Sequence, residues 1–392
     1  MKLSKRLDQI KPSATLAVAA KAAELKSQGI DVINMGTGEP DFATPEHIKQ
    51  AAITAINNNQ TRYTPVDGTV ELKTAIIAKL KRDNKLNYTP EKIIVSNGAK
   101  HSLFNALTAT LNRGDEVIIP VPYWVSYPDM VQLCGGKPVI IATDHHQGFK
   151  ITPEQLKQTI TTKTKAIILN SPTNPTGMVY SETELQGLAE VLLKHPEIFI
   201  ITDDIYEHIM WNKHSFCNII NACPELYDRT ILINGVSKAY AMTGWRIGFA
   251  AGPHAVIKAM KKVQSQSTSG PSSISQAAAA AAFSGDQSCL KPMVQAFHER
   301  HDMFVKGINK IPGFDCLPAH GAFYLFPHVQ AAIDKLANIN NDVEFANYLL
   351  EKAHIATVPG SAFGAPGYLR LSYACSTEQI QEVLTRIKAA LA

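Results

Sequence analysis

The chain has 392 residues, 45% of them hydrophobic and 18% charged, which is long enough for two domains with separate cores. Its formal net charge is +4, and the basic residues are scattered rather than gathered in one block, so nothing predicts a nucleic-acid partner. Its six cysteines form no CxxC pair, so neither a metal site nor a disulfide framework is expected. The first eleven residues lack the apolar core of a signal peptide, and the longest run of small apolar residues, 277–283, is too short to cross a membrane, so we expect a cytoplasmic protein with no membrane partner.

Helical and extended patterns alternate along the chain. A helix is expected at 12–28, and Ser181 with Glu184 forms a capping-box pattern at the start of another at 181–194. Between these helices and a third at 101–111, short apolar runs predict the strands. The expected strands of the central region are 91–95, 115–119, 137–142, 164–169, 198–202 and 230–233, and a further short strand at 31–34 belongs to the N-terminal segment. Apolar strands joined through helices indicate an α/β fold with a mostly parallel central sheet flanked by helices.

The C-terminal third of the chain predicts a second unit. It contains helical patterns near 272–285, 291–309, 342–353 and from 377 onward, with extended segments at 322–326 and 368–373. Together with the N-terminal segment, these elements predict a smaller α/β domain made from both ends of the chain. We therefore expect a large domain at 45–285 and a small domain at 1–44 and 286–392.

Unusual polar residues follow the predicted strands, where ligands of open α/β sheets bind. Lys238 follows the strand at 230–233 in the run Asn234-Gly-Val-Ser-Lys-Ala-Tyr-Ala-Met-Thr-Gly-Trp-Arg-Ile-Gly248. An amine in that position can form a Schiff base with a carbonyl. Arg246, in the same run, is a fixed cation suited to a phosphate. Each residue alone has a simpler interpretation as a surface residue, but together they predict a site for a phosphate-bearing carbonyl compound.

Asp203 and Tyr206 follow the strand at 198–202, in Asp203-Asp-Ile-Tyr206. A carboxylate that emerges from a sheet can hold a pyridine nitrogen protonated, which turns the ring into an electron sink. Asp204 stands at the same strand end and is the alternative, and a helix cap would explain either carboxylate.

Two further segments lie at predicted strand ends. Asn97-Gly-Ala-Lys100 precedes a helix, whose first N–H groups bind phosphate, and Gly98 lets the backbone approach closely. Ser171-Pro-Thr-Asn-Pro-Thr-Gly177 is a turn held extended by its two prolines.

Aromatic and cationic side chains complete the candidate site. Trp124, in Pro122-Tyr-Trp-Val-Ser-Tyr-Pro128, offers a face on which a flat ring can stack, although core packing is the simpler explanation of a lone tryptophan. Arg370, in the predicted strand 368–373, can pair with a carboxylate through two parallel hydrogen bonds, or form a structural salt bridge.

These segments, in order and at matching spacing from Lys11 to Ser372, resemble the class I aminotransferases, the aspartate aminotransferase family of fold type I. The resemblance implies a fold type I transferase that depends on pyridoxal 5′-phosphate. Lys238, Asp203 and Tyr206 would be its catalytic residues: Lys238 would carry the cofactor and move the substrate proton, Asp203 would hold the ring nitrogen and Tyr206 the ring O3′.

The same resemblance implies the binding residues. The cofactor set would be Gly98, Ala99, Lys100, Trp124, Asn174, Asp203, Tyr206, Ser237, Lys238, Arg246 and Tyr63. Tyr63, in the segment Thr61–Gly68, would serve the neighbouring subunit, which implies a homodimer with shared active sites. The substrate set would be Gly38, Trp124, Asn174, Arg370, Thr15, Lys100 and Lys11, with Arg370 on the α-carboxylate.

Two positions depart from the family pattern. Many relatives have a glycine where this chain has Ala99, and another branch has a serine phosphate ligand where this chain has Gly235. Phosphate binding is therefore expected to depend more on Ser237, Arg246 and the Gly98 turn.

Thr15 and Lys100 match the bacterial aspartate aminotransferase subgroup, which uses them at the side-chain end of the substrate. The implied reaction is transamination of L-aspartate with 2-oxoglutarate to oxaloacetate and L-glutamate, by a ping-pong mechanism. Three alternatives stay open: an aspartate/prephenate aminotransferase in which Lys11 binds a further carboxylate, an aromatic aminotransferase, and a C–S lyase of the same fold.

Overall fold

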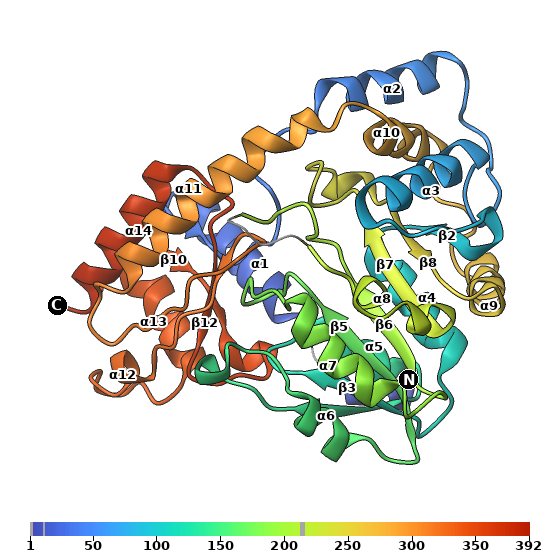
Figure 1. Cartoon of the computed structure of the whole chain (residues 1–392). Coiled ribbons are helices and arrows are strands. Elements are labelled where there is room, and N and C mark those ends of the chain that lie inside the picture. The colour runs from blue at the N-terminus through green and yellow to red at the C-terminus, as the bar shows by residue number, and fades with distance from the viewer. Residues whose placement is uncertain (1–2, 11, 212–215) are drawn as a thin grey trace.

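The computed structural model describes residues 3–10, 12–211 and 216–392, and Figure 1 shows two units side by side. The larger unit contains a seven-stranded sheet in the order β2-β8-β7-β6-β5-β3-β4. Its strands are β2 Ile93–Ser96, β3 Glu116–Pro120, β4 Lys137–Ile141, β5 Thr164–Asn170, β6 Phe199–Asp203, β7 Thr230–Gly235 and β8 Gly248–Ala251. All neighbouring pairs are parallel except the two made by β8, so the expected mostly parallel sheet is confirmed.

Strand β8 was not predicted. Gly248-Phe-Ala-Ala251 has no β-branched residue, so its composition does not mark a strand. It runs antiparallel between β2 and β7, with Gly235 opposite Gly248 in the register.

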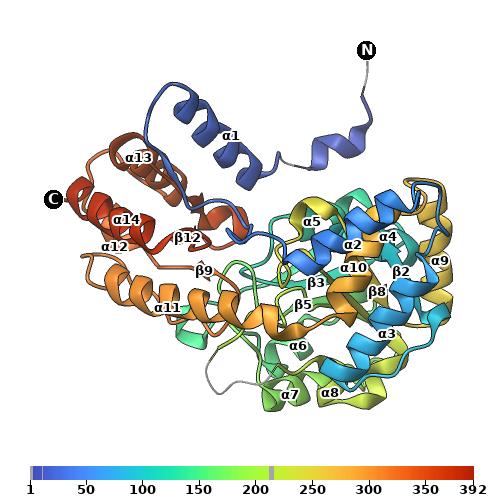
Figure 2. The same ribbon diagram turned by 90° about the horizontal axis from the view of Figure 1, so that it is seen from above.

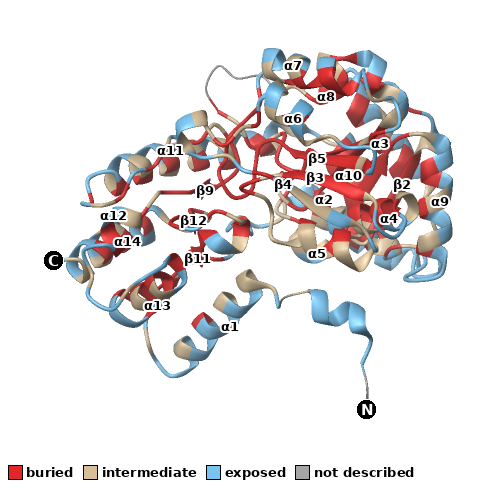
Figure 3. Ribbon diagram, turned by 90° about the horizontal axis from the view of Figure 1, so that it is seen from below, coloured by how far each residue is buried: buried red, intermediate tan, exposed pale blue. Residues whose placement is uncertain are grey.

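Helices cover both faces of this sheet, as the buried interior in Figure 3 shows. Successive strand residues face opposite sides, so Ile93 and Val95 belong to the core on one face of the sheet, while Ile94 belongs to the core on the other face. Burial on both faces explains why the strands are apolar at nearly every position. The helices of this unit are α2 Glu46–Asn57, α3 Val70–Asn84, α4 Ala99–Thr110, α5 Ser126–Leu133, α6 Pro153–Thr159, α7 Glu182–Leu192, α8 Ile219–Ala222, α9 His254–Ser265 and α10 Ser273–Ser284.

The capping box predicted at the start of α7 is confirmed. The Ser181 side chain accepts from the Glu184 N–H, and the Glu184 side chain accepts from the Ser181 N–H. Helices α2, α3, α5, α6, α8 and α9 were not predicted.

The smaller unit has its own core around two small sheets. β1 pairs in parallel with β10, and β12 lies between β11 and β9 in an antiparallel sheet. Its elements are α1 Ala14–Ser27, β1 Ile33–Asn34, α11 Leu290–Ile308, β9 Tyr324–Leu325, α12 Gln330–Ile333, α13 Asp342–Ala353, β10 Ile355–Ala356, β11 Val358–Pro359, β12 Leu369–Ser372 and α14 Thr377–Ala390.

The segment after β6 joins the two units, because Ile205, Tyr206 and Ile209 are buried in the core of the smaller one. The domain bounds 45–285, and 1–44 with 286–392, remain a prediction.

The N-terminal segment also reaches both units (Figure 2). Helix α1 lies against β1, β10 and β11, whereas the 3-10 turn Lys5–Gln9 lies against α5. Further 3-10 turns are Pro90–Lys92, His145–Gln147, Pro224–Arg229, Thr243–Trp245, Gln287–Cys289 and Gly360–Phe363. In the described part of the chain, every helix is too short or too polar to span a bilayer.

Candidate active site

A cavity of about 280 Å³ lies where the carboxyl ends of the parallel strands meet the smaller unit. Twelve of the predicted site residues line it: Thr15, Gly38, Ala99, Lys100, Trp124, Asn174, Asp203, Tyr206, Ser237, Lys238, Arg246 and Arg370. The other lining residues are Ser13, Leu16, Val125, Ser126, Tyr127, Asn170, Ile205, Thr243 and Tyr324. A concave site with converging polar groups at strand ends is the expected place for a small ligand.

Lys238 follows β7 and projects into this cavity. Its Nζ donates a hydrogen bond to the Gly38 carbonyl oxygen at 2.7 Å, across the boundary between the two units. Burial lowers the pKa of Lys238 to about 8; Glu39 opposes this change, while the Arg370 and Arg246 cations add to it. The lowered pKa gives this amine a larger neutral fraction near neutral pH than an ordinary lysine has, which favours a role as nucleophile and base.

Asp203, and not Asp204, faces the cavity. Asp203 accepts a hydrogen bond from the Tyr127 hydroxyl at 2.7 Å. Asp204 points away from the cavity and accepts from Thr202 Oγ1 at 2.6 Å and from the Asn218 side chain. Burial raises the pKa of Asp203 to about 6, opposed by the Tyr127 hydrogen bond, the Ile205 N–H and Lys238.

Arg370 is a buried cation with no carboxylate partner among the described residues. Its Nη1 donates to Asn174 Oδ1 at 2.9 Å and its Nη2 to the Gly36 carbonyl oxygen at 2.6 Å. Its Nε has no hydrogen-bond partner within the described chain. The guanidinium also lies 4.6 Å from the Tyr324 ring centroid. The structural salt bridge considered as an alternative is therefore not present in the described structure, and a buried, unpaired guanidinium favours an anionic ligand.

The turn between β2 and α4 holds Arg246. Gly98 has φ +86°, which favours glycine, and a Cβ on it would lie 2.4 Å from Arg246 Nη2, so a side chain there would displace the guanidinium. Arg246 donates from Nη1 to the Thr243 carbonyl oxygen at 2.7 Å. With Ser237 and the first N–H groups of α4, it forms an anion-binding end of the cavity.

Position 235 cannot carry the serine found in another branch of the family. A Cβ on Gly235 would lie 2.8 Å from the Ile247 carbonyl oxygen, because β7 and β8 pair closely there.

Lys100 and Thr15 line the same cavity from different units. Lys100 Nζ lies 4.7 Å from the Trp124 ring centroid, and burial, together with nearby Arg246, lowers the Lys100 pKa. Thr15 lies in the first turn of α1, with its hydroxyl 2.9 Å from the Ser13 hydroxyl.

Three predicted residues are not in this lining. Gly98 lies behind the lining and contacts Arg246, which does line the cavity. Tyr63 is fully exposed, outside the cavity of its own chain. Lys11 lies outside the described residues.

Tyr127 and Tyr324 were missed by the sequence reasoning. The Tyr324 hydroxyl lies 2.7 Å from the Tyr206 hydroxyl. A Cβ on Gly38 would lie 2.5 Å from the same Tyr324 oxygen. Tyr127 lies three residues after Trp124 in the segment Pro122–Pro128, and this short spacing was the available signal. Tyr324 had no local signal, because its partners come from distant parts of the chain.

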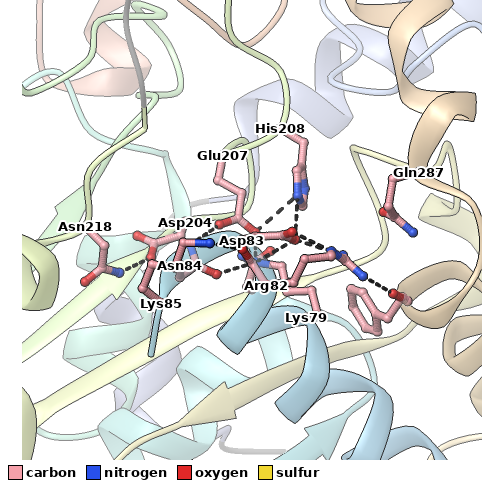
Figure 4. Close-up of polar contacts among 12 residues, drawn as sticks. Lys79, Arg82, Asp83, Asn84, Lys85, Asp204, Glu207, His208, Asn218 and Gln287 are labelled. Atoms are coloured by element: carbon pink, nitrogen blue, oxygen red, sulfur yellow. Dashed lines mark hydrogen bonds and ion pairs between the residues drawn. The ribbon is translucent and has the colours of Figure 1, made fainter. Parts of the chain in front are cut away.

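A buried polar network supports the segment that carries Tyr206 (Figure 4). Glu207 forms an ion pair with Lys79 of α3, and accepts hydrogen bonds from Asn84 and Asn234 at 2.7 Å each. Since Asn234 lies in β7, this network ties the strand before Lys238 and the segment after Asp203 to the same helix.

Comparison with known proteins identifies the family. Residues 30–387 match the model of aminotransferase class I and II. The chain is 56% identical to the aspartate/prephenate aminotransferase of Nitrosomonas europaea, with both chains covered completely. It is 51% identical to the aspartate aminotransferase of Rhizobium meliloti, over 98% of this chain and 95% of that one.

The comparison with solved structures identifies the same family. The aspartate aminotransferase of Rhizobium meliloti superposes with a TM-score of 0.96 at 49% identity, covering 100% of this chain and 99% of that one. That of Thermus thermophilus with maleate gives 0.94 at 41% identity, with both chains fully covered. The fold and its strand-end cavity thus define a transferase of fold type I. The chain belongs to the class I and II aminotransferase family and is an aminotransferase.

Proposed function

We propose that the protein is an aspartate aminotransferase that depends on pyridoxal 5′-phosphate. It transfers the amino group of L-aspartate to 2-oxoglutarate, giving oxaloacetate and L-glutamate in a ping-pong cycle. The observation that carries the proposal is the buried, unpaired Arg370 in the same cavity as Lys100, with the Lys238 amine exposed to that cavity. Two cations suit a dicarboxylic substrate, and the relatives named aspartate aminotransferases support this choice.

The residues present fit the cofactor. Arg246, Ser237 and the α4 start around Gly98 would hold its phosphate, Trp124 would cover its ring, and Asp203 would hold the ring nitrogen. Tyr206 and Asn174 would bind the ring O3′. When bound, pyridoxal phosphate supplies an electron sink that stabilises negative charge on the substrate α-carbon.

The protein's own groups then do the following work. Arg370, held by Asn174 and Gly36, orients the substrate α-carboxylate through parallel N–H donors. The Lys238 Nζ takes the α-proton and later returns it, as a base whose pKa lies near the working pH. Lys100 and Thr15 bind the far carboxylate, with Gly38 at the closing edge of the cavity.

The Nitrosomonas europaea relative, named an aspartate/prephenate aminotransferase, favours prephenate amination as a second activity. Lys11 is the residue that we propose for the additional carboxylate. We also propose a cytoplasmic homodimer with a role in amino-acid biosynthesis, in which the exposed Tyr63 completes the partner's site.

Steady-state kinetics test the proposal. The protein loaded with pyridoxal phosphate should show parallel double-reciprocal lines with aspartate and 2-oxoglutarate, and a kcat/KM for aspartate well above that for phenylalanine. Prephenate with an amino donor is the matched assay for the second activity, and Lys11→Ala should lower only that rate. A preference for phenylalanine, or elimination without amino transfer, would contradict aspartate transamination.

A further inference from the structure

Tyr127 makes a buried hydrogen bond to the carboxylate that faces the cavity. It is the second residue of α5, only 3% exposed, and its hydroxyl lies 2.7 Å from Asp203 Oδ2. Burial and the adjacent Asp203 raise the pKa of Tyr127 well above its ordinary value, so the phenol keeps its proton and donates it. Asp203 is therefore the acceptor.

The same helical turn places Trp124. The Tyr127 N–H donates to the Trp124 carbonyl oxygen at 2.9 Å, and the two rings meet edge to face with centroids 5.4 Å apart. One turn thus sets both the aromatic face of the cavity and the donor to Asp203. Within the described residues, the other carboxylate oxygen, Oδ1, accepts one long hydrogen bond, from the Ile205 N–H at 3.4 Å.

Few groups favour the ionised form of Asp203. Lys238, after β7, is the facing cation, while Asp204 and Tyr206 lie on the same segment as Asp203. Asn170 of β5 donates only to the Asp203 backbone carbonyl oxygen. Because burial opposes ionisation, the hydrogen bond from Tyr127 contributes a large share of what keeps this group charged.

We propose that Tyr127 is a positioning residue for amino transfer: its hydroxyl fixes Asp203 Oδ2, keeps the carboxylate ionised and leaves Oδ1 for the cofactor ring nitrogen. The proposal rests on the proposed function, because the ring nitrogen belongs to the cofactor. Tyr127 acts through Asp203, because its hydroxyl is engaged with that carboxylate.

The test removes a single oxygen atom. Tyr127→Phe should raise the pKa of the Asp203 carboxyl by about one to two units, the shift expected when a charged acceptor loses a donor. The carboxyl signals of the full-length protein without cofactor, labelled with ¹³C-aspartate, measure this, and Asp203→Asn assigns the signal. Tyr123→Phe, which removes a hydroxyl from the same segment, should leave the signal unchanged.

The loaded enzyme should show the same change in its pH profile. Activity needs the carboxylate, so it is present above the pKa that Asp203 has in the loaded enzyme and is lost as the pH falls through that pKa. In Tyr127→Phe that loss should begin about one to two pH units higher, with kcat falling more than KM changes. Replacing Tyr127 by 3-fluorotyrosine, a more acidic donor, should shift the loss of activity to lower pH. This variant decides the question if Tyr127→Phe does not fold.

An Asp203 titration that is unchanged in Tyr127→Phe would overturn the proposal, and so would a shifted titration with an unshifted activity limb. If the wild-type protein binds pyridoxal phosphate without transferring amino groups, the proposed function falls and the positioning role falls with it. The titration of the protein without cofactor would still show whether Tyr127 controls Asp203, so the two failures are distinguishable.

Discussion

At the scale of single residues, burial changes the acid–base chemistry of the cavity. The pKa of Lys238 is lowered and the pKa of Asp203 is raised, and both changes come mainly from desolvation. Neighbouring groups adjust these pKa values further: Glu39, Arg370 and Arg246 act on the amine as charges, and Tyr127 acts on the carboxylate as a hydrogen-bond donor. Groups with such altered pKa values, gathered in one cavity, are typical of active sites.

We expect Lys238→Ala to abolish amino transfer and the visible absorption that pyridoxal phosphate gains on the wild-type protein. Only the neutral amine attacks a carbonyl, so capture of the cofactor by the wild-type protein should speed up as the pH rises, and level off above about 8. Stopped-flow absorbance against pH measures this. Lys258→Ala, on the exposed side of α9, is the control, and loss of the band in that variant instead would place the reactive lysine elsewhere.

Substrate selection should depend on Lys100. Lys100→Ala removes a partly desolvated cation, so KM for aspartate and glutamate should rise about ten- to a hundredfold, while phenylalanine is hardly affected (about 1.5–3 kcal/mol for an interaction with a charged group). Steady-state assays with the three donors measure the difference. Equal losses on acidic and aromatic donors would assign Lys100 to phosphate binding or stability.

At the scale of elements, close packing between strands and helix starts builds the anion-binding end of the cavity. A Cβ on Gly248 would lie 2.1 Å from the Ala99 N–H nitrogen, so β8 supports the first turn of α4 directly. Gly98 then brings that turn against Arg246. Both contacts require glycine, and they come from segments about 150 residues apart in the chain.

Gly98→Ala should weaken cofactor binding at least tenfold, about 1.4 kcal/mol or more, because the new Cβ meets Arg246 and the positive φ strains alanine. Titration of the protein with pyridoxal phosphate gives the dissociation constant. Gly244→Ala is the matched control in the Lys238–Arg246 run, since its Cβ would meet nothing within 4 Å. Equal affinities for the two variants would show that the turn does not position the phosphate group.

The network around Glu207 should contribute to stability. Lys79→Met leaves Glu207 buried without its cation and should lower the free energy of unfolding by about 3–5 kcal/mol. Urea unfolding measures the loss, and Lys81→Met, exposed on the same helix, is the control. The double variant Lys79→Met with Glu207→Gln should recover part of the loss; if it is no more stable than Lys79→Met alone, the unpaired charge is not the cause.

At the scale of the whole molecule, the cavity lies between two cores and is lined from both. Thr15 and Arg370 come from the smaller unit, and Lys238 and Asp203 from the sheet. Tyr63, by contrast, lies on the surface of the larger unit, and Ile53 and Ile56 of α2 are also exposed. This combination is what a shared dimer site requires.

Mixing two inactive variants tests that sharing. A hybrid of Tyr63→Ala and Lys238→Ala chains contains one site with both residues intact, so activity should reappear. A mixture of Lys238→Ala with Arg246→Ala should stay inactive, because both of those residues serve the site of their own chain. A monomer by light scattering at assay concentrations would end the shared-site idea.

The sequence by itself determined the fold class and most of the sheet, and it singled out Lys238 as the candidate central residue, because these inferences follow from local patterns. Apolar strands buried on both faces have a continuous apolar signal, and Ser181 caps α7 through a neighbour three residues away. The motif segments were also recognisable from their residue order, through their resemblance to the class I aminotransferases. Their meeting at one strand-end edge follows from parallel topology.

The family resemblance favoured Asp203 over Asp204, but only the tertiary structure showed which carboxylate faces the cavity, what holds Arg370, and how β8 enters the sheet. Asp203 and Asp204 are indistinguishable in composition, and strand alternation together with the Tyr127 and Asn218 side chains separates them. The contacts of Arg370 with Asn174 and Gly36 join residues 196 and 334 positions apart. Such pairings depend on how the whole chain packs, and no local periodicity records them.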